Sequence, residues 1–476
     1  MREDILRERK RKLDAYEKKA YAFPARLEGE RVSAREYLEK FHGEEKTVAG
    51  RIASLRDQGK IVFCDLKDET GKLQVVLEEK KTDGFALREF LDQGDIIEVE
   101  GEGFTNKRGE KGMMALRFRL LAKALRPVPV EWFGLEDTES RLRSRYLDLL
   151  LDEETKELFR KKAAFWKTAR DFLLAEGFLE VETPVLEAVP GGAEAEPFTT
   201  HMNALDEDFY LRISLELPLK KLLIGGYERV FEIGRIFRNE GIDREHLQDY
   251  TQMECYAAYL DYGWMMERMQ ALYQAIAKNL FGNMKSSYQG KEINWGGKWE
   301  KVDYYEIFKK EAGVDLSKAG RKELEAKAKS LGLSPEPFAG EGRLIDLIFK
   351  KTVRPKLVKP CFLVDPPVSV EPLAKRTERD AGRVERFQIM ACGTELGKGF
   401  SELNDPRDQR SRFEEQAKLR KKGDKEAQMT DEAFLEALEH GMPPSAGFGM
   451  SERLFSVMMG KPIRETVVFP LMRKEK

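Results

Sequence analysis

Five short runs with the pattern of β-strands lie between residues 47 and 125, and they constrain the fold of this region most strongly. The runs are VAGRIASLR, KIVFCDLKD, KLQVVLEE, DIIEVEGEGF and MMALRFRLLAKAL, and turns that contain glycine or aspartate separate them. A helix-like stretch, FALREFLDQG, stands between the third and the fourth run. Five strands with one helix in this place predict a small closed barrel.

This order is typical of the OB-fold, which we predict for residues 47–126. Such barrels bind single-stranded nucleic acid by stacking bases on exposed aromatic side chains beside positive charge. Residues 1–46 precede the barrel and begin with a charged helix from Met1 to about Phe23. Two interpretations of this helix stand: a solvated surface, or a basic surface that adds phosphate contacts.

The composition indicates a soluble globular protein with a heavily charged surface, because 41% of the residues are hydrophobic and 35% are charged. A net charge of -2 argues against binding of nucleic acid over the whole surface, but it is compatible with a local basic patch. The charged N-terminus lacks a signal-peptide core, and no apolar run reaches the roughly 20 residues of a membrane span. Four cysteines without a CxxC pair argue against zinc and disulfides. We therefore expect a cytoplasmic protein with no membrane partner.

Beyond the barrel, residues 127–146 contain two prolines and are predicted to be a linker. Residues 147–476 mix α and β patterns and are predicted to form a second domain. Within it, residues 262–350 are more helical and polar, which suggests an insertion. The fold class is therefore α+β.

The stretch from Arg229 to Tyr259 is the most specific motif and predicts a strand, a loop and a strand. Its FRNEG turn brings an arginine and a glutamate together, and an arginine there can clamp a phosphate bidentately. A surface hairpin with a salt bridge explains the turn equally well. A second stretch, GFLEVETPVLEAVPGGAEAEPF, predicts a helix end and then a strand broken at Pro184.

A third stretch, CGTELGKGFSELNDPRDQR, predicts a strand on which Lys398, Phe400 and Glu402 face one side. Glu254 and Tyr256 likewise share one face of the strand that follows the FRNEG turn. Carboxylates and a phenol in one cleft suit a cationic ligand, although a half-buried strand with a solvated face is the plain alternative. A fourth stretch, GFGMSER, predicts a glycine-rich strand that enters a helix near Arg453.

The order of GFLEVETP, FRNEG, GFGMSER and IRETVVFP resembles motifs one, two and three of class II aminoacyl-tRNA synthetases. The preceding barrel narrows the resemblance to the lysine, aspartate and asparagine subgroup. Runs such as VEPLAKR and GFSELNDPRDQRSRFEEQ resemble lysyl-tRNA synthetases, of which the chain looks like a divergent, bacterial-type member. The resemblance covers about residues 47–473.

The resemblance implies an anticodon-binding OB-fold, a catalytic domain built on a mostly antiparallel sheet flanked by helices, and a homodimer. Pro184 matches the motif one proline at the dimer interface. The expected partners are tRNA(Lys), lysine and ATP. In the barrel, positions that hold the anticodon are matched by Arg56, Phe63 and Gln74.

For ATP, the resemblance implies that Arg238 binds the α-phosphate and the substrate carboxylate, and that Arg453 covers adenine and reaches the γ-phosphate. These two arginines are the expected catalytic residues. The other expected ATP contacts are Glu240, His246, Tyr250 and Glu395. Glu395 also matches a ligand of the cofactor Mg2+, with Gln388 at the place of a second carboxylate.

For lysine, the resemblance implies contacts to the α-amino group from Gly192, Glu216 and Glu254. Tyr256 and Glu402 would hold the ε-ammonium, and Phe400 would pack on the aliphatic stem. A cation taken out of water needs such paired anions to recover its desolvation free energy.

Three departures from the family pattern concern the site. Gln388 is a neutral amide, which leaves the number of Mg2+ ions open. Lys398 replaces an asparagine and would pair either the substrate carboxylate or Glu402. The GFGMSER motif is one residue short, so its strand-to-helix junction must be rebuilt. Two alternatives therefore accompany a lysine–tRNA ligase: a class II ligase for another amino acid, and a tRNA-binding paralogue without charging activity.

Overall fold

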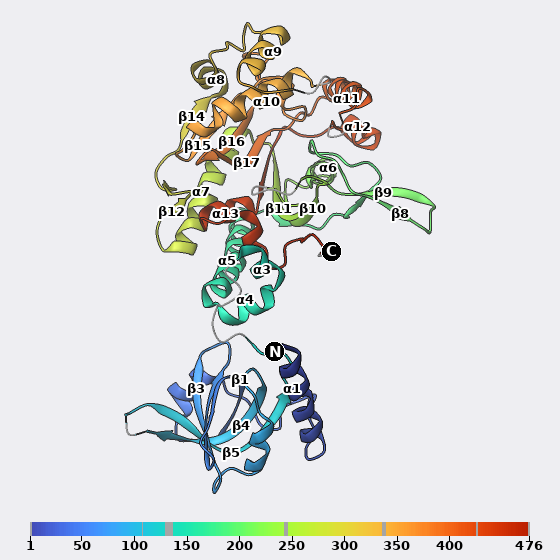
Figure 1. Cartoon of the computed structure of the whole chain (residues 1–476). Coiled ribbons are helices and arrows are strands. Elements are labelled where there is room, and N and C mark those ends of the chain that lie inside the picture. Colours follow the sequence, from blue (N-terminus) through green and yellow to red (C-terminus); the bar gives the residue numbers. More distant parts are fainter. Residues whose placement is uncertain are drawn as a thin grey trace. The chain divides into compact units, whose positions relative to one another are not determined.

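The structure, a computed structural model, describes residues 2–106, 108–128, 137–241, 246–335, 339–424 and 427–474. The chain divides into two compact units, Met1–Leu147 and Asp148–Lys476 (Figure 1). Of the predicted linker, residues 129–136 lie outside the described part. Residues 137–146 include helix α3 (Thr138–Arg143) and the start of α4 (Arg145–Leu151).

The first unit contains the predicted OB-fold as a closed five-stranded barrel in the order β1-β2-β3-β5-β4. A 3-10 helix, η2 (Phe85–Phe90), lies between the third and fourth strands, where the sequence predicts a helix. The strands are β1 (Lys46–Asp57), β2 (Ile61–Lys67), β3 (Lys72–Glu78), β4 (Ile96–Thr105) and β5 (Lys111–Ala122).

Alternation along the strands builds the barrel interior. On β2, Val62, Cys64 and Leu66 are buried, whereas Phe63 and Asp65 between them are only half-buried. Since successive side chains of a strand point to opposite faces, the apolar set forms the core and the polar and aromatic set forms the outer face.

Helix α1 (Arg2–Glu17) packs on this barrel through its buried side. The Tyr16 hydroxyl accepts a hydrogen bond from the backbone N–H of Leu120 (3.1 Å), and Arg9 donates to the backbone oxygen of Gln93 (3.0 Å). The helix ends before the predicted Phe23, which has a positive φ of 58° and precedes a proline. A short helix, α2 (Ala34–Glu36), and a π-helical turn, η1 (Tyr37–Phe41), lead into the barrel.

The second unit is built on an eight-stranded, mostly antiparallel sheet, which confirms the α+β class II catalytic fold. Its strand order is β14-β15-β16-β17-β18-β11-β10-β6. In chain order the strands are β6 (Leu179–Glu180), β10 (Arg229–Phe237), β11 (Asp249–Ala258), β14 (Glu300–Asp303), β15 (Cys361–Val364), β16 (Arg386–Ala391), β17 (Thr394–Ser401) and β18 (Ser445–Ser451).

Helices cover both faces of this sheet (Figure 1). One face packs against α5 (Glu153–Ala175), α7 (Tyr262–Phe281) and α13 (Arg453–Met458). The other face packs against α6 (Glu216–Ile224) and α12 (Glu432–Glu439). The remaining helices are α8 (Tyr304–Ala312), α9 (Arg321–Ser330), α10 (Glu341–Thr352), η3 (Arg354–Lys356), η4 (Val368–Val370), α11 (Pro406–Lys421) and η5 (Ile463–Thr466).

Two parts of the segment 262–350, which the sequence suggests as an insertion, belong to the main architecture. Helix α7 buries Met265, Met269 and Tyr273 in the core beneath the sheet, and β14 is the edge strand of the sheet. Helices α8, α9 and α10 surround a smaller core of their own. Short strands complete the unit: β7 (Leu186–Glu187), β8 (Thr199–Met202) and β9 (Glu207–Leu211) form one small sheet, and β12 (Lys285–Tyr288) and β13 (Lys291–Asn294) another.

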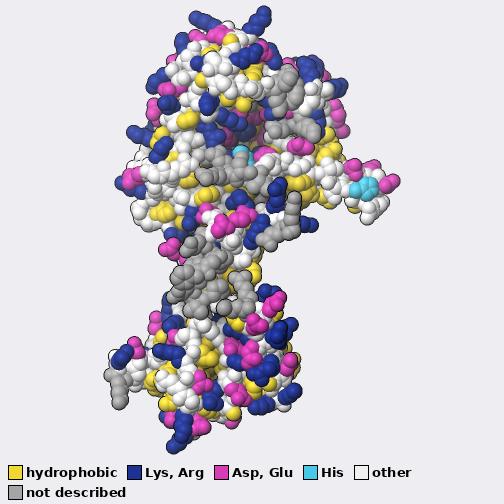
Figure 2. Space-filling model, in the orientation of Figure 1, with side chains coloured by type: hydrophobic (Ala, Val, Ile, Leu, Met, Phe, Trp, Pro, Cys, Tyr) yellow, Lys and Arg dark blue, Asp and Glu magenta, His cyan; other side chains and the backbone are white. Residues whose placement is uncertain are grey.

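Basic and acidic side chains are interspersed over the visible face of each unit in Figure 2. Among the described residues, no helix combines the length and apolar character needed to cross a bilayer.

Candidate active site

The central sheet brings most of the predicted site residues onto one face. Residues directly opposite one another on antiparallel neighbours have their side chains on the same side of a sheet. Two adjacent rows cross β16, β17, β18 and β11 in this way. They consist of Gln388, Lys398, Gly449 and Glu254, and of Arg386, Phe400, Gly447 and Tyr256.

The two glycines of β18 differ in how much space lies above them. A Cβ atom at Gly447 would lie 2.2 Å from Glu402 Oε1 and 2.4 Å from Tyr256 Cε1. A Cβ atom at Gly449 would come no closer than 3.3 Å, to Glu254 Cγ. The absence of a side chain at Gly447 is therefore needed to place Glu402 and Tyr256 as they are.

Glu254 is a buried carboxylate whose position is fixed by hydrogen bonds. Its Oε1 accepts from Ser214 Oγ (2.8 Å), the Leu215 backbone N–H (2.9 Å) and Gln252 Nε2 (2.6 Å). Its Oε2 accepts from the Tyr256 hydroxyl (2.8 Å). The carboxylate has partners on β11 and on the segment that leads into α6, so it is a rigid negative group in the site.

A buried cation, Lys220, joins two further carboxylates of the site. Its Nζ lies 2.5 Å from Glu216 Oε1 and 2.5 Å from Glu402 Oε2, and all three residues are buried. The motifs do not point to Lys220. The one signal in the sequence is its spacing of four residues from Glu216, which places the two side chains side by side on a helix.

Burial shapes the protonation of this cluster. It raises the pKa of Glu216 to about 7 and the pKa of Glu402 well above its ordinary value, while Lys220 opposes both shifts. Burial alone would lower the pKa of Lys220, but the carboxylates of Glu216 and Glu402 outweigh it and raise this pKa. Burial also raises the pKa of Tyr256. Tyr256 is therefore a neutral hydrogen-bonding group at neutral pH.

Lys398 does not pair with Glu402, one of the two partners that the sequence left open. Its Nζ lies 2.8 Å from Glu371 Oε2, and Arg386 Nε lies 3.6 Å from the same oxygen. Burial raises the pKa of Glu371, but Lys398 and Arg386 outweigh it and lower this pKa. Glu371 precedes Lys398 by 27 residues in the chain, and no local sequence pattern predicts that they pair.

The loop that contains Gly192 packs closely on the start of α6. Gly192 has a φ of +82°, which favours glycine, and a Cβ there would lie 2.9 Å from Glu216 Cβ and 3.0 Å from Ser214 Cβ. This loop therefore lies beside two of the predicted contacts to the α-amino group, Glu216 and Glu254.

Four of the residues predicted to bind ATP lie near one another, around Tyr250 at the start of β11. The guanidinium carbon of Arg238 lies 5.7 Å from the Tyr250 ring centroid, and Arg238 Nε donates to the Ile213 backbone oxygen (3.2 Å). Burial raises the pKa of Tyr250, while the nearby charges of Arg238 and Arg453 lower it and that of Glu240 raises it. These effects place all four residues in one neighbourhood.

The shortened motif three junction is fixed by Glu452, the residue before Arg453. Its carboxylate pairs with Lys162 of α5 and accepts from the Thr251 backbone N–H of β11 (3.1 Å). Lys162 also donates to the Thr466 backbone oxygen (2.8 Å). The start of α13 is therefore tied to three other elements.

The two residues predicted to hold a metal lie beside each other on β16 and β17. Gln388 Nε2 donates to Glu395 Oε2 (2.5 Å). One carboxylate is thus available where the family pattern has two. Among the residues that the structure describes, no group of three or more His, Cys, Asp or Glu is arranged to hold a metal ion.

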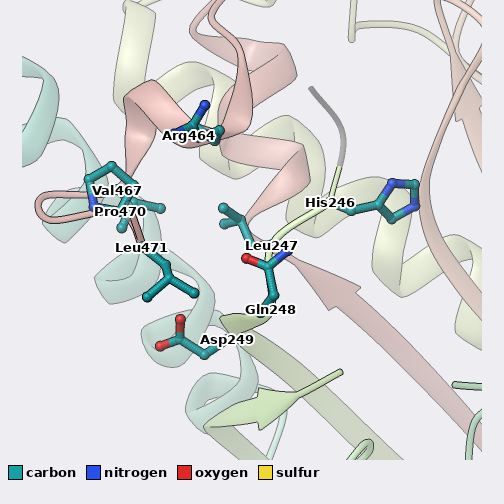
Figure 3. A pocket seen from close by; sticks show the side chains of 8 residues that line it. All are labelled: His246, Leu247, Gln248, Asp249, Arg464, Val467, Pro470 and Leu471. Carbon is teal, nitrogen blue, oxygen red and sulfur yellow. The ribbon is translucent and has the colours of Figure 1, made fainter. Parts of the chain in front are cut away.

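His246 lines a small pocket formed with the C-terminal segment (Figure 3). Pro470 and Leu471 lie on the opposite side of the pocket from His246, and the imidazole points away from them (Figure 3). The other lining residues are Leu247, Gln248, Asp249, Arg464 and Val467. Of the predicted site residues, only His246 lines this pocket.

The three predicted anticodon contacts lie on one outer face of the barrel. Arg56 and Phe63 are opposite each other on β1 and β2, with the guanidinium carbon 5.9 Å from the ring centroid. Gln74 on β3 lies opposite Asp65, which shares the face of Phe63 by the two-residue period.

Pro184 is exposed between β6 and β7. The neighbouring apolar side chains are also exposed: Leu179 by 47%, Val185 by 38% and Leu186 by 46%. This cluster of exposed apolar residues differs from the mixed, charged surface elsewhere and marks a candidate interaction surface.

Comparison with known proteins agrees with this geometry. A family model described as tRNA synthetases class II (D, K and N) matches residues 137–473. A second model, described as an OB-fold nucleic acid binding domain, matches residues 46–121.

Similar proteins are aligned over nearly the whole chain. A lysine–tRNA ligase of Moorella thermoacetica is 43% identical over 458 residues, which are 95% of this chain and 94% of that protein. A lysine–tRNA ligase of Carboxydothermus hydrogenoformans is 43% identical, covering 93% and 92%. One of Thermotoga maritima is 41% identical, covering 95% and 93%. With a family match over more than half of its length and relatives of this identity and coverage, the chain belongs to the class II tRNA synthetases of the D, K and N group.

Proposed function

We propose that this protein is a lysine–tRNA ligase, which activates lysine with ATP and transfers it to the 3' end of tRNA(Lys). The observation that carries this choice within the family is the set of buried carboxylates Glu216, Glu254 and Glu402 on the active face of the sheet. Three carboxyl groups in one buried site suit a substrate with two ammonium groups. An aspartate or asparagine substrate would need a cationic or amide pocket instead.

In this proposal, lysine lies over Gly449, between the side chains of β17 and those of β11. The α-ammonium contacts Glu254, Glu216 and the Gly192 loop. The ε-ammonium contacts Glu402 and Tyr256, with the aliphatic stem against Phe400. The absence of a side chain at Gly449 supports this placement, because no atom would lie closer than 3.3 Å to a Cβ atom there.

The reaction needs positioning more than protein nucleophiles. A carboxylate oxygen of lysine attacks the α-phosphorus, the bond from that phosphorus to the bridging oxygen breaks, and pyrophosphate leaves. The terminal hydroxyl of tRNA then attacks the carbonyl carbon, and AMP leaves. Arg238 and Arg453 would offset the charge that develops on the phosphates, and Tyr250, Glu240 and His246 would hold the nucleotide.

Mg2+ is the proposed cofactor, and the donors on this face fit it in part. Glu395 offers one hard carboxylate oxygen, and Mg2+ commonly combines one or two carboxylates with substrate phosphates. When bound, the ion offsets the charge of the phosphates. Glu395 would orient it, and the remaining ligands would come from ATP and water.

For tRNA, we propose that the outer barrel face with Arg56, Phe63 and Gln74 binds the anticodon. An aromatic ring to stack on a base, an adjacent guanidinium and an amide for a base edge support this assignment. We further propose a homodimer through the surface around Pro184, and a cytoplasmic location.

Amino-acid-dependent ATP–pyrophosphate exchange, with each standard amino acid in turn, tests the proposal. We expect exchange with lysine alone. Exchange with another amino acid would keep the family but overturn the pocket assignment. Folded protein without exchange for any amino acid would be the result expected of a tRNA-binding paralogue that does not charge.

A further inference from the structure

A lysine side chain stands in the middle of the carboxylates proposed to receive the substrate. The Lys220 side chain has no exposed surface, and its Nζ lies 2.5 Å from both Glu216 and Glu402. The aromatic rings of Phe400 and Phe434 lie 5.4 Å and 5.9 Å from the same nitrogen. A fixed cation here repels a second cation unless the surrounding carboxylates outnumber it.

The two oxygens of Glu402 have different surroundings. Both are buried without a hydrogen-bond partner among the described residues, but Oε2 forms an ion pair with Lys220 (2.5 Å), whereas Oε1 does not. Oε1 lies over Gly447, next to the Tyr256 ring. One carboxylate can therefore serve two cations, an internal one through Oε2 and a substrate ammonium through Oε1.

The formal charge of the cluster matches the charge of the substrate's two ammonium groups. Glu216, Glu254 and Glu402 contribute three negative charges and Lys220 one positive charge, which leaves -2. Lysine brings two ammonium groups. Without Lys220 the pocket would carry three carboxylates for two cations, and one of them would have no positive partner in a buried site.

We propose that Lys220 is a positioning residue that sets the charge of the lysine pocket: it favours the ionised forms of Glu402 and Glu216 against the effect of burial, so that the substrate's two ammonium groups displace fewer protons when they bind. This inference rests on the proposed function. Lys220 contacts the carboxylates and not the reacting atoms, so it acts through Glu402 and Glu216.

The other groups around Glu402 cannot replace this charge. The titratable groups that face it are Glu216 and Lys220 from α6, Tyr256 from β11, and Glu371 from the segment after η4. Tyr256 is neutral and donates a hydrogen bond to Glu254, and Glu371 is already paired with Lys398. Removal of Lys220 therefore leaves Glu402 with neutral or negative neighbours, and its carboxyl takes up a proton.

The test is calorimetric lysine binding to the Lys220→Met enzyme at pH 7.5, in two buffers that differ in ionisation enthalpy. We expect more protons to be released per lysine bound than in the native enzyme, because Glu402 loses the cation that opposes the effect of burial on its ionisation. The KM for lysine should rise about tenfold for each pH unit below the new pKa of Glu402, with the KM for ATP unchanged. Lys221→Met is the matched control, because Lys221 is adjacent on α6 but exposed and 3.8 Å from Asp431.

An unchanged number of released protons in folded Lys220→Met would overturn the proposal and leave Lys220 a structural ion pair. If Lys220→Met does not fold, the double variant Lys220→Met with Glu216→Gln restores the formal charge of -2. We then expect it to fold and still to release more protons than the native enzyme, because Glu402 has again lost its cation, and the native number would refute the idea. The native enzyme is measured first. Failure to bind lysine or to support exchange there refutes the proposed function, whereas native binding with a native-like variant refutes only the role of Lys220.

Discussion

Gly447 is the residue at which one added carbon atom should have the largest effect on the pocket. Gly447→Ala would place a Cβ 2.2 Å from Glu402 Oε1 and displace Glu402 or Tyr256. We expect folding to lose about 1–3 kcal/mol, as in overpacked cores, and the KM for lysine to rise more than the KM for ATP. Gly71→Ala is the control, because a Cβ atom at Gly71, in the first unit, would have no atom within 4 Å. Equal kinetic effects of the two variants would mean that Glu402 and Tyr256 do not contact lysine.

Glu402 is the residue on which selection of the ε-ammonium depends. We expect Glu402→Gln to lower kcat/KM for lysine by about 10²–10³-fold, because breaking a buried ion pair costs roughly 3–5 kcal/mol. ATP binding should stay near normal, as judged by the shift in melting temperature that ATP produces. Glu432→Gln, an exposed change on α12, serves as the control. Equal loss of ATP binding would show that Glu402 is misplaced in the proposed site.

The sequence predicts single residues well where a motif surrounds them and poorly where a contact spans the fold. Glu254, Tyr256 and Phe400 fall on the face that strand alternation predicts. Lys220 and Lys221 are adjacent lysines of similar appearance in the chain, yet one is fully buried and the other is exposed. What distinguishes them is the position of Glu402, almost 200 residues later, which no local pattern contains.

Among the elements, α11 is held to the segment 371–376 in part by the carboxylate of Asp408. Asp408 accepts hydrogen bonds from Arg412 (2.7 Å) and Arg376 (3.1 Å). Burial raises the pKa of Asp408, but these two guanidinium groups outweigh it and lower the pKa to about 2. Because the folded pKa lies below the unfolded value, the stabilisation is present above about pH 4 and is lost as the pH falls toward 2.

We therefore expect Asp408→Asn to lower the free energy of unfolding by about 2 kcal/mol at pH 7. The difference from the native protein should shrink between pH 4 and pH 2. Urea denaturation at pH 7, 4 and 3 measures it. Asp346→Asn, at a more exposed pair on α10, is the control. A difference that does not depend on pH would show that Asp408 acts through packing and not through its charge.

The sequence predicts the helices and strands better than it predicts their positions in the fold. The barrel strands, the break at Pro184 and the start of α13 at Arg453 agree with local alternation, proline chemistry and the glycine-rich motif. Helix α7 and strand β14 looked like parts of an insertion because their segment is polar on average. Their membership of the main sheet layer depends on pairing with β15 and on burial of Met265 and Met269, which are long-range contacts.

At the scale of the whole molecule, the exposed apolar surface around Pro184 predicts self-association. We expect native protein to have twice the mass of the chain by size-exclusion chromatography with light scattering. Leu186→Asp should shift it toward the monomer by placing a charge in the buried interface. Tyr21→Asp, at an exposed residue of the first unit, should leave the mass unchanged. A monomeric native protein would contradict the dimer.

The four cysteines offer a practical consequence for studying the two units in solution. All four are buried, and burial raises the pKa of Cys64 and Cys361 to about 12 and those of Cys255 and Cys392 above their ordinary value. The thiolate, which is the form that reacts with maleimides, is therefore scarce at neutral pH. One cysteine introduced at an exposed barrel position such as Gln58 would carry nearly all of an attached dye. The native chain thus already serves as the background for fluorescence studies of tRNA capture.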